Sequence, residues 1–380
     1  MLNFFYMYAI IWGIILLFYS FGWSDLCSSI EPELFVFFVI TIFASITLGG
    51  LLNKDYTFCK YEVTVSRSRF PVVIIVAFCI LEFIYCGQVP LFYIILRGSG
   101  YTEYSGIPTL HTLVISYGSF YAQYLFYRYI QSNDDTKALL DYVIVLFFIF
   151  VLQFNRGGLV ISVFMSLLMY LAKNSNKISK RINHKTIFGG IITFLLLMFA
   201  FGALGNLRHG FSLSDSSYIE ELGLFNGTYP SWLPKQFMWA YIYIITPIAN
   251  INYNVAMQVG SMNVEGYIMS LIPDFVSRRL FSDVIYKPNL VMERVFNATA
   301  GFGTAYMNAG TFGMYFFYIY MMFILTLLWK IIPIRKEYRM PCLAIMNAIV
   351  VFMFFTNTFY YSAISFQLIF PLLSFIRIKR

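Results

Sequence analysis

The chain has few charged residues: Asp, Glu, Lys and Arg make up only 12% of its 380 residues, while hydrophobic residues make up 59%. In soluble domains about a quarter of the residues are charged. This scarcity excludes an ordinary soluble enzyme and predicts a protein with several membrane-spanning helices. The net charge of +8 does not indicate a nucleic-acid partner, because most Lys and Arg lie in short clusters between apolar runs, where they report membrane orientation.

Groups that bind metals are also scarce. The five cysteines include no Cys-x-x-Cys spacing, and the three histidines, His111, His184 and His209, lie far apart in the sequence. Zinc and haem sites are recognised in a sequence by close, regular spacing of such ligands. We therefore predict no metal site, no cofactor and no disulfide framework.

Long apolar runs recur along the whole chain. A helix needs roughly 20 apolar residues to span a bilayer, so we predict an all-α polytopic membrane protein with about 10 transmembrane helices. These helices form a single integral membrane domain over residues 1–380. The runs cover residues 4–23, 34–52, 71–87, 110–130, 139–154, 159–172, 186–204, 311–332, 342–357 and 359–376.

The charges between the runs alternate as the positive-inside rule requires. Acidic residues follow the first run, from Asp25 to Glu33. Basic clusters lie after the second run and in later connections, at residues 54–69, 173–185, 330–339 and 377–380. This alternation predicts that both termini are cytoplasmic.

One long segment, residues 205–310, interrupts the series of runs. We predict that it is a large loop on the outer side of the membrane with interfacial helices. Within it, residues 237–251 are apolar enough to enter the membrane. We expect them outside or re-entrant; a helical pair there would give about 12 spans without reversing either terminus.

Basic residues on the predicted outer side need an explanation other than orientation, and most of them are arginine. A planar guanidinium grips phosphate oxygens bidentately, which suits a pyrophosphate. These outer basic residues are Arg97, Arg156, Arg208, Lys235, Arg278, Arg279, Lys287 and Arg294.

Two motifs place such arginines at the ends of runs. Arg156 stands in the tight turn FNRGG, and Arg208 and His209 stand in GNLRHG. For Arg156 the alternative is contact with lipid head groups. For His209 a solvated turn residue is the more common role, because the neighbouring cation disfavours its protonation.

Residues 274–285 form an amphipathic pattern with Arg278 and Arg279 on its polar side. Pro273 suits the opening of a helix, so we predict a short interfacial helix. Its arginines either bind an anion or solvate the helix, with Arg279 pairing with Asp283 four residues on.

Glu82 lies within the third run, about 7.5 Å below its outer end by helical rise. A carboxylate in a membrane is costly unless it faces a wet cavity or a partner, so Glu82 is a functional candidate. The alternative is a structural ion pair with one of the outer arginines.

Small residues recur every fourth position in GFGTAYMNAGTFG, which favours close helix packing. Tyr306 and Asn308 lie off that face and remain available to a ligand.

Taken together, LEFIYCGQVPLF, SGIPTLH, NRGG, GNLRHG and GFGTAYMNAGTFG, in this order among the runs, resemble the bacterial O-antigen polymerases, the Wzy type of oligosaccharide repeat-unit polymerase. The likeness extends from about Leu81 to Tyr320. It implies a GT-C-like, metal-independent glycosyltransferase of the bacterial inner membrane, which moves a growing glycan from undecaprenyl pyrophosphate onto a new lipid-linked repeat unit at the periplasmic face during lipopolysaccharide biosynthesis. A chain-length regulator of the Wzz type and the lipid bilayer are the implied partners.

Family members depend on periplasmic arginines, and this dependence implies roles for several residues. The base that accepts the acceptor proton stays open among Glu82, Asp274, Glu293 and His209. The long double-arginine loop repeats of some members are absent, so separate donor and acceptor loops are not assigned. The catalytic candidates are Arg156, Arg208, Arg278, Arg279 and Glu82, and the substrate-binding candidates are Arg294, His209, Asp274, Tyr306 and Asn308.

Two other functions compete with this reading. An O-antigen ligase uses the same kind of lipid pyrophosphate donor and differs in its acceptor. A lipid-linked oligosaccharide flippase is disfavoured, because transporters usually carry internal repeats and the two halves of this chain show none.

Overall fold

The computed structural model describes residues 3–52, 68–97, 104–132, 135–181, 184–281, 284, 289–331 and 336–373. This part of the chain is helical and has no strand, and its one extended pairing is a bridge between Ser24 and Phe225. The main helices are α1 (Phe4–Ser20), α2 (Pro32–Leu51), α3 (Phe70–Cys86), α4 (Pro90–Arg97), α5 (Leu110–Gln131), α6 (Thr136–Leu146), α7 (Arg156–Arg181), α8 (His184–Arg208), α9 (Ser217–Leu222), α10 (Phe237–Ala256), α11 (Val264–Leu271), α12 (Asp274–Leu280), α13 (Gly303–Ile331), α14 (Arg339–Phe352), α15 (Ser362–Ser365) and α16 (Ile369–Leu373).

The predicted runs correspond to helices. The fifth run is α6 followed directly by the π-helical turn Phe147–Val151. The last run, residues 359–376, begins as a helix at Ser362, later than predicted, and α15, a 3-10 turn (Phe366–Leu368) and α16 follow one another directly to Leu373, the last described residue. Pro371 lies in this stretch, and a proline cannot donate the backbone hydrogen bond of a regular α-helix.

Among the described residues, three helices are long and apolar enough to cross a membrane: α2, the Arg156–Asn174 part of α7, and α13. A fourth candidate is the pair α3 and α4, which is bent by 47°. The larger number of about 10 spans, the GT-C-like arrangement and the orientation of the termini stay predictions.

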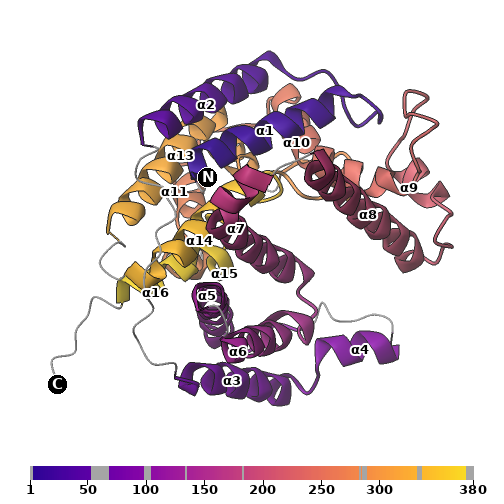
Figure 1. Cartoon of the computed structure of the whole chain (residues 1–380). Coiled ribbons are helices and arrows are strands. Elements are labelled where there is room, and N and C mark those ends of the chain that lie inside the picture. Colours follow the sequence, from indigo (N-terminus) through magenta and orange to yellow (C-terminus); the bar gives the residue numbers. More distant parts are fainter. Residues whose placement is uncertain are drawn as a thin grey trace.

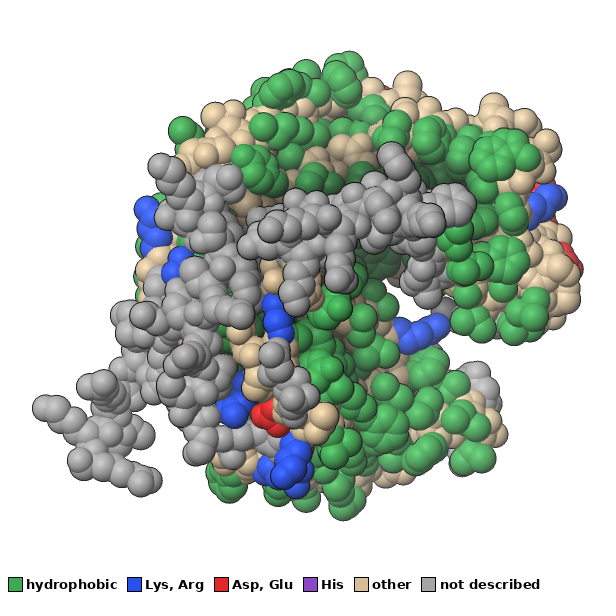
Figure 2. Space-filling view, viewed as in Figure 1, with side chains coloured by type: hydrophobic (Ala, Val, Ile, Leu, Met, Phe, Trp, Pro, Cys, Tyr) green, Lys and Arg blue, Asp and Glu red, His purple; other side chains and the backbone are tan. Residues whose placement is uncertain are grey.

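Hydrophobic side chains are unusually exposed on the helices. Phe43, Ile84, Leu196 and Phe323 each expose more than 60% of their surface. Figure 2 shows many hydrophobic side chains on this face, among them those over α3. Large exposed apolar areas are rare on soluble monomers, so these outward faces are suited to contact with lipid.

The bundle contains two hydrophobic cores. The larger joins α1, α2, α10, α13 and α14, and at its centre the Trp12 ring packs 4.5 Å from Phe38 and 5.6 Å from Phe302, between ring centroids. The smaller core joins α3, α5 and α6 around Ile75 and Ile149. Figure 1 shows α3 and α6 on the far side of α5 from α1 and α2, with α7 and α14 between the two groups.

The segment predicted as a large outer loop contains a buried helix. Most residues of α10 are buried, and it packs against α1, α8 and α13. The contact with α8 is so close that only a glycine fits at position 202. A Cβ atom there would lie 1.9 Å from the carbonyl oxygen of Gln236. Thus α10 is part of the helix bundle.

Contacts between helix ends mark two ends of the bundle. At one end, Thr311 donates to Glu33 (2.7 Å), joining the start of α2 to the break in α13. At the other end, Arg69 lies 3.7 Å from Asp141, and the hydroxyl of Tyr121 donates to the Ser68 carbonyl. We call the first end, which also holds the start of α5 and the end of α3, the mouth of the bundle.

Candidate functional site

The buried carboxylate of Glu82 is the centre of a polar cluster at the mouth. Only 1% of Glu82 is exposed. Its closest partner is the Nδ1 atom of His111, which lies 3.1 Å from Oε1 and 3.2 Å from Oε2. The other groups that donate to this carboxylate are the Tyr104 hydroxyl (3.5 Å), the Ile107 backbone N–H (3.3 Å) and the Gln153 amide (3.4 Å).

This pairing corrects one expectation from the sequence. Within the described residues, the Glu82 carboxylate pairs with His111, whose side chain is 30% exposed, and with no arginine. The sequence quoted His111 within SGIPTLH but gave it no role. The two residues are 29 positions apart, so their contact depends on the packing of α3 on α5. No local pattern in the sequence predicts it.

A glycine in the preceding loop allows His111 to approach Glu82. Gly106 has a positive φ of 67°, and a Cβ atom there would lie 2.6 Å from Nδ1 of His111. Tyr104 lies two residues before Gly106 in the same loop and donates to Glu82. Burial, followed by the nearby Glu82 carboxylate, raises the pKa of Tyr104 well above its ordinary value, so its hydroxyl stays protonated and can donate.

Helix α12 connects this cluster to the rest of the mouth through Arg279. The Arg279 guanidinium lies 4.0 Å from the Phe275 ring centre and donates to the Phe275 carbonyl. It also donates to the Thr109 hydroxyl at 2.5 Å. Thr109 directly precedes α5 and is two residues before His111. Arg279 is therefore bonded to the same segment that carries the histidine of the Glu82 cluster.

The neighbouring Arg278 turns to a different surface. It lies 3.6 Å from Asp274, one helical turn earlier, and its side chain is 70% exposed. A hydrogen bond with Tyr360 and then the charge of Asp274 raise the pKa of Arg278 above its ordinary value. The alternative of an Arg279–Asp283 pair falls outside the described residues, since Asp283 is not among them.

Arg278 borders the first of two adjoining cavities. The Arg278 cavity, of about 430 Å³, is also lined by Thr304, Asn357 and Tyr360. The second, which we call the NRGG cavity, has about 460 Å³ and lies at the start of α7, where Asn155, Gly157 and Gly158 line it. Both cavities are lined by Thr299, Thr356 and Tyr361.

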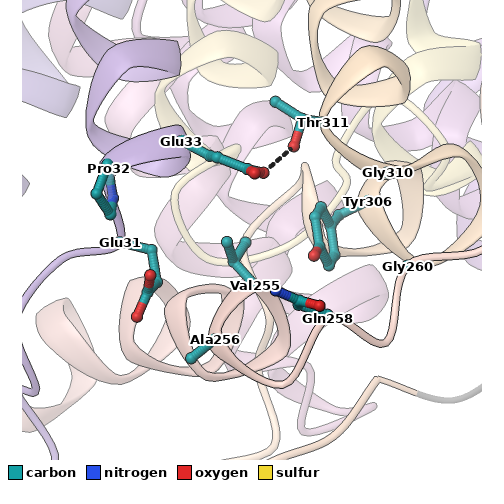
Figure 3. Close-up of a pocket in the computed structure, with 10 residues that line it drawn as sticks. All are labelled: Glu31, Pro32, Glu33, Val255, Ala256, Gln258, Gly260, Tyr306, Gly310 and Thr311. Carbon is teal, nitrogen blue, oxygen red and sulfur yellow. Dashed lines mark hydrogen bonds between the residues drawn. The ribbon is translucent and has the colours of Figure 1, made fainter.

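A third cavity, of about 560 Å³, lies between α2, α10 and the break in α13. Figure 3 shows Glu31 and Glu33 on one side of it and Tyr306 and Gln258 on the other. The break arises at Ala309 and Gly310, which have non-helical backbone angles. The two carboxylates make this cavity unsuitable for a pyrophosphate.

The remaining candidates fall at scattered places. Arg156 opens α7, and its guanidinium lies over the Phe154 ring at 4.8 Å, while Arg294 is exposed. His209 is stacked with Tyr218 (4.4 Å) and Trp239 (5.2 Å), away from Glu82. The Arg208 backbone ends α8, but its side chain lies outside the described residues.

The structure shows the surroundings of three further predicted ligand contacts. Asp274 accepts from the Ser362 backbone N–H at 2.9 Å as well as facing Arg278, so it ties α12 to α15. Tyr306 lines the third cavity, together with Glu31 and Glu33. Asn308 was expected to be free for a ligand; it is buried, donates to the Thr304 carbonyl and lies against Gly266 of α11.

The described residues contain no group of three or more His, Cys, Asp or Glu side chains that could hold a metal ion. Comparison with known proteins gave no relative: the chain matches no family model, no curated protein and no solved structure. The candidate site therefore consists of the Glu82–His111 pair, the two arginines of α12 and the two adjoining cavities.

Proposed function

We propose that this protein is a membrane glycosyltransferase that polymerises repeat units carried on undecaprenyl pyrophosphate, as in O-antigen synthesis. One observation carries the proposal: α12 presents Arg278 to a cavity while Arg279, the next residue, bonds to Thr109 beside the Glu82–His111 pair. Arg278, a cation suited to the leaving group, and His111, a base suited to the acceptor, thus lie at the same end of the bundle.

Arg278 is suited to the pyrophosphate of the donor. Its guanidinium is exposed at the cavity and stays charged, and fixed cations stabilise the charge that develops on a departing phosphate. In the proposed reaction the bond between the anomeric carbon and the pyrophosphate oxygen breaks. Undecaprenyl pyrophosphate leaves with both electrons of that bond.

His111 is suited to the acceptor. The Glu82 carboxylate holds Nδ1, which orients the ring and leaves Nε2 to accept a proton from the acceptor hydroxyl. The acceptor oxygen then bonds to the anomeric carbon of the growing glycan. Three of the four bases left open by the sequence have other contacts: Glu82 acts here through His111, Asp274 bonds to Arg278 and Ser362, and His209 lies in an aromatic stack.

The direct test is the lipopolysaccharide ladder of a cell from which the gene is deleted. We expect lipid A core with a single repeat unit, restored to a full ladder by the wild-type gene and not by Arg278→Ala. Lys235→Ala is the matched control, because Lys235 is an outer basic residue paired with Glu220 at 2.5 Å; it should restore the ladder.

Other results for the deletion strain would identify other functions. Bare core with polymer stranded on its carrier would identify a ligase, and bare core with single units stranded would identify a flippase. Full complementation by Arg278→Ala would remove this arginine from the mechanism.

A further inference from the structure

The Arg278 and NRGG cavities, taken together, have a lining that is almost entirely uncharged. Together they have one charged lining residue, Arg278, among the residues that the structure describes. The rest of the lining consists of hydroxyl, amide, glycine, aromatic and aliphatic groups. Such a surface can bind one anionic group at Arg278. Its remaining groups can form hydrogen bonds with neutral hydroxyls.

One lining group lacks a partner. Gln367 is 2% exposed, and its Nε2 atom donates to the Ala363 carbonyl at 2.9 Å. Gln367 is one of the residues that line the NRGG cavity, and its buried Oε1 atom has no hydrogen-bond partner in the described part of the chain. A buried acceptor without a partner destabilises the protein, so a ligand that donates a hydrogen bond to this oxygen gains affinity.

Aromatic rings complete the lining. Phe355 and Tyr361 both line the NRGG cavity and are 36% and 53% exposed. The C–H faces of sugar rings pack on such surfaces, and their hydroxyls bond to amides and hydroxyls around them. Thr356, which borders both cavities, has no side-chain hydrogen bond in the described structure and can bond to such a hydroxyl.

We propose that the two cavities form one binding groove for a phosphate-linked glycan, with the phosphate end at Arg278 and the sugars in the NRGG cavity against Gln367, Thr356 and Tyr361. This proposal rests on the proposed function, because it locates the sugar end of the same lipid-linked substrate. The residues shared by the two cavities make them contiguous, and the single cation at one end gives the groove its direction.

The groove can be tested by binding to the full-length protein in lipid nanodiscs. The two probes are undecaprenyl pyrophosphate and the undecaprenyl-pyrophosphate-linked repeat unit extracted from the deletion strain. We expect the wild type to bind the glycosylated probe at least about tenfold more tightly, since a few hydrogen bonds of ordinary strength give this ratio.

Two variants remove single groups from the sugar end. Gln367→Leu and Thr356→Val should each reduce that ratio about three- to tenfold and leave the affinity for undecaprenyl pyrophosphate unchanged. Gln236→Leu is the control: Gln236 is another buried glutamine whose amide donates to a backbone carbonyl, that of Leu213, and it does not line the groove. It should keep the wild-type ratio.

Three results would overturn the groove. The first is equal affinity of the wild type for both probes, and the second is an unchanged ratio in both folded groove variants. The third is an equal loss of both probes in those variants, which would place the lipid chain in the cavity. A normal ladder in the deletion strain would instead end the polymerase proposal; the binding ratio is then measured with lipid-linked units from wild-type cells.

Discussion

The imidazole of His111 lies 3.1 Å from a carboxylate oxygen of Glu82, and that carboxylate is almost completely buried. The contact joins the start of α5 to the last turns of α3. A carboxylate in this position fixes the ring of the histidine, and it stabilises the imidazolium that forms when the ring accepts a proton.

Replacing His111 by Ala should lower the rate of polymer formation by about 10²- to 10⁴-fold, the usual contribution of a general base. The assay uses purified protein and lipid-linked repeat units. We expect kcat to fall while KM stays close to its wild-type value, because the histidine takes its proton only in the transition state. Glu82→Gln should show the same split to a smaller extent.

His209→Ala serves as the histidine control for that experiment. His209 is stacked on Tyr218 and Trp239. It should retain most of the wild-type kcat. Wild-type kcat in His111→Ala would show that the pair is structural.

Replacing Arg278 by Lys should make carrier binding sensitive to alkaline pH. The raised pKa of Arg278 keeps the cation present throughout the alkaline range, so wild-type affinity for undecaprenyl pyrophosphate should be flat from about pH 8 to pH 10.5. Lysine has an ordinary pKa of about 10.4, so half of its charge is lost near that pH.

The measurement is the dissociation constant across this pH range. The lysine variant should also bind more weakly at pH 8, because an ammonium cannot grip two phosphate oxygens at once. Parallel pH curves for the two proteins would show that residue 278 does not meet the pyrophosphate.

Gly202→Ala should destabilise the contact between α8 and α10. The added Cβ atom would lie 1.9 Å from the backbone carbonyl oxygen of Gln236, which cannot rotate away. Overpacking of this kind typically costs about 1–3 kcal/mol, and it should lower Tm in detergent.

Gly13→Ala is the matched helix-glycine control, because a Cβ atom there meets nothing within 4 Å. Alanine is the better helix former by about 1 kcal/mol, so Tm should stay the same or rise. Equal Tm values for both variants would mean that α8 and α10 do not pack as described.

Labelling of single cysteines tests the orientation of the mouth. In a cysteine-free background, Trp232→Cys should react with a membrane-impermeant maleimide in intact spheroplasts, since Trp232 is 80% exposed on the predicted outer side. Ser68→Cys, exposed at the opposite end, should react only after permeabilisation. The reverse pattern would invert the topology and place the candidate site in the cytoplasm.

The positions of the helices were predictable from the sequence to a large extent. Apolar runs are bounded by charged or turn residues, and a lipid environment requires every backbone polar group within a run to be paired inside its own helix. The short helix with Arg278 and Arg279 was predicted from its amphipathic pattern, and Glu82 from the cost of a carboxylate in an apolar run. Each of these signals is local.

The sequence by itself therefore determined the helical class, the places of most helices and the presence of a carboxylate and two arginines that need an explanation. Tertiary structure decided their partners: His111 for Glu82, Thr109 for Arg279, and a place for α10 inside the bundle. Thr109 and Arg279 are 170 positions apart. No local pattern encodes such a contact, because it depends on which helix faces pack together, and side-chain shape over the whole bundle sets that packing.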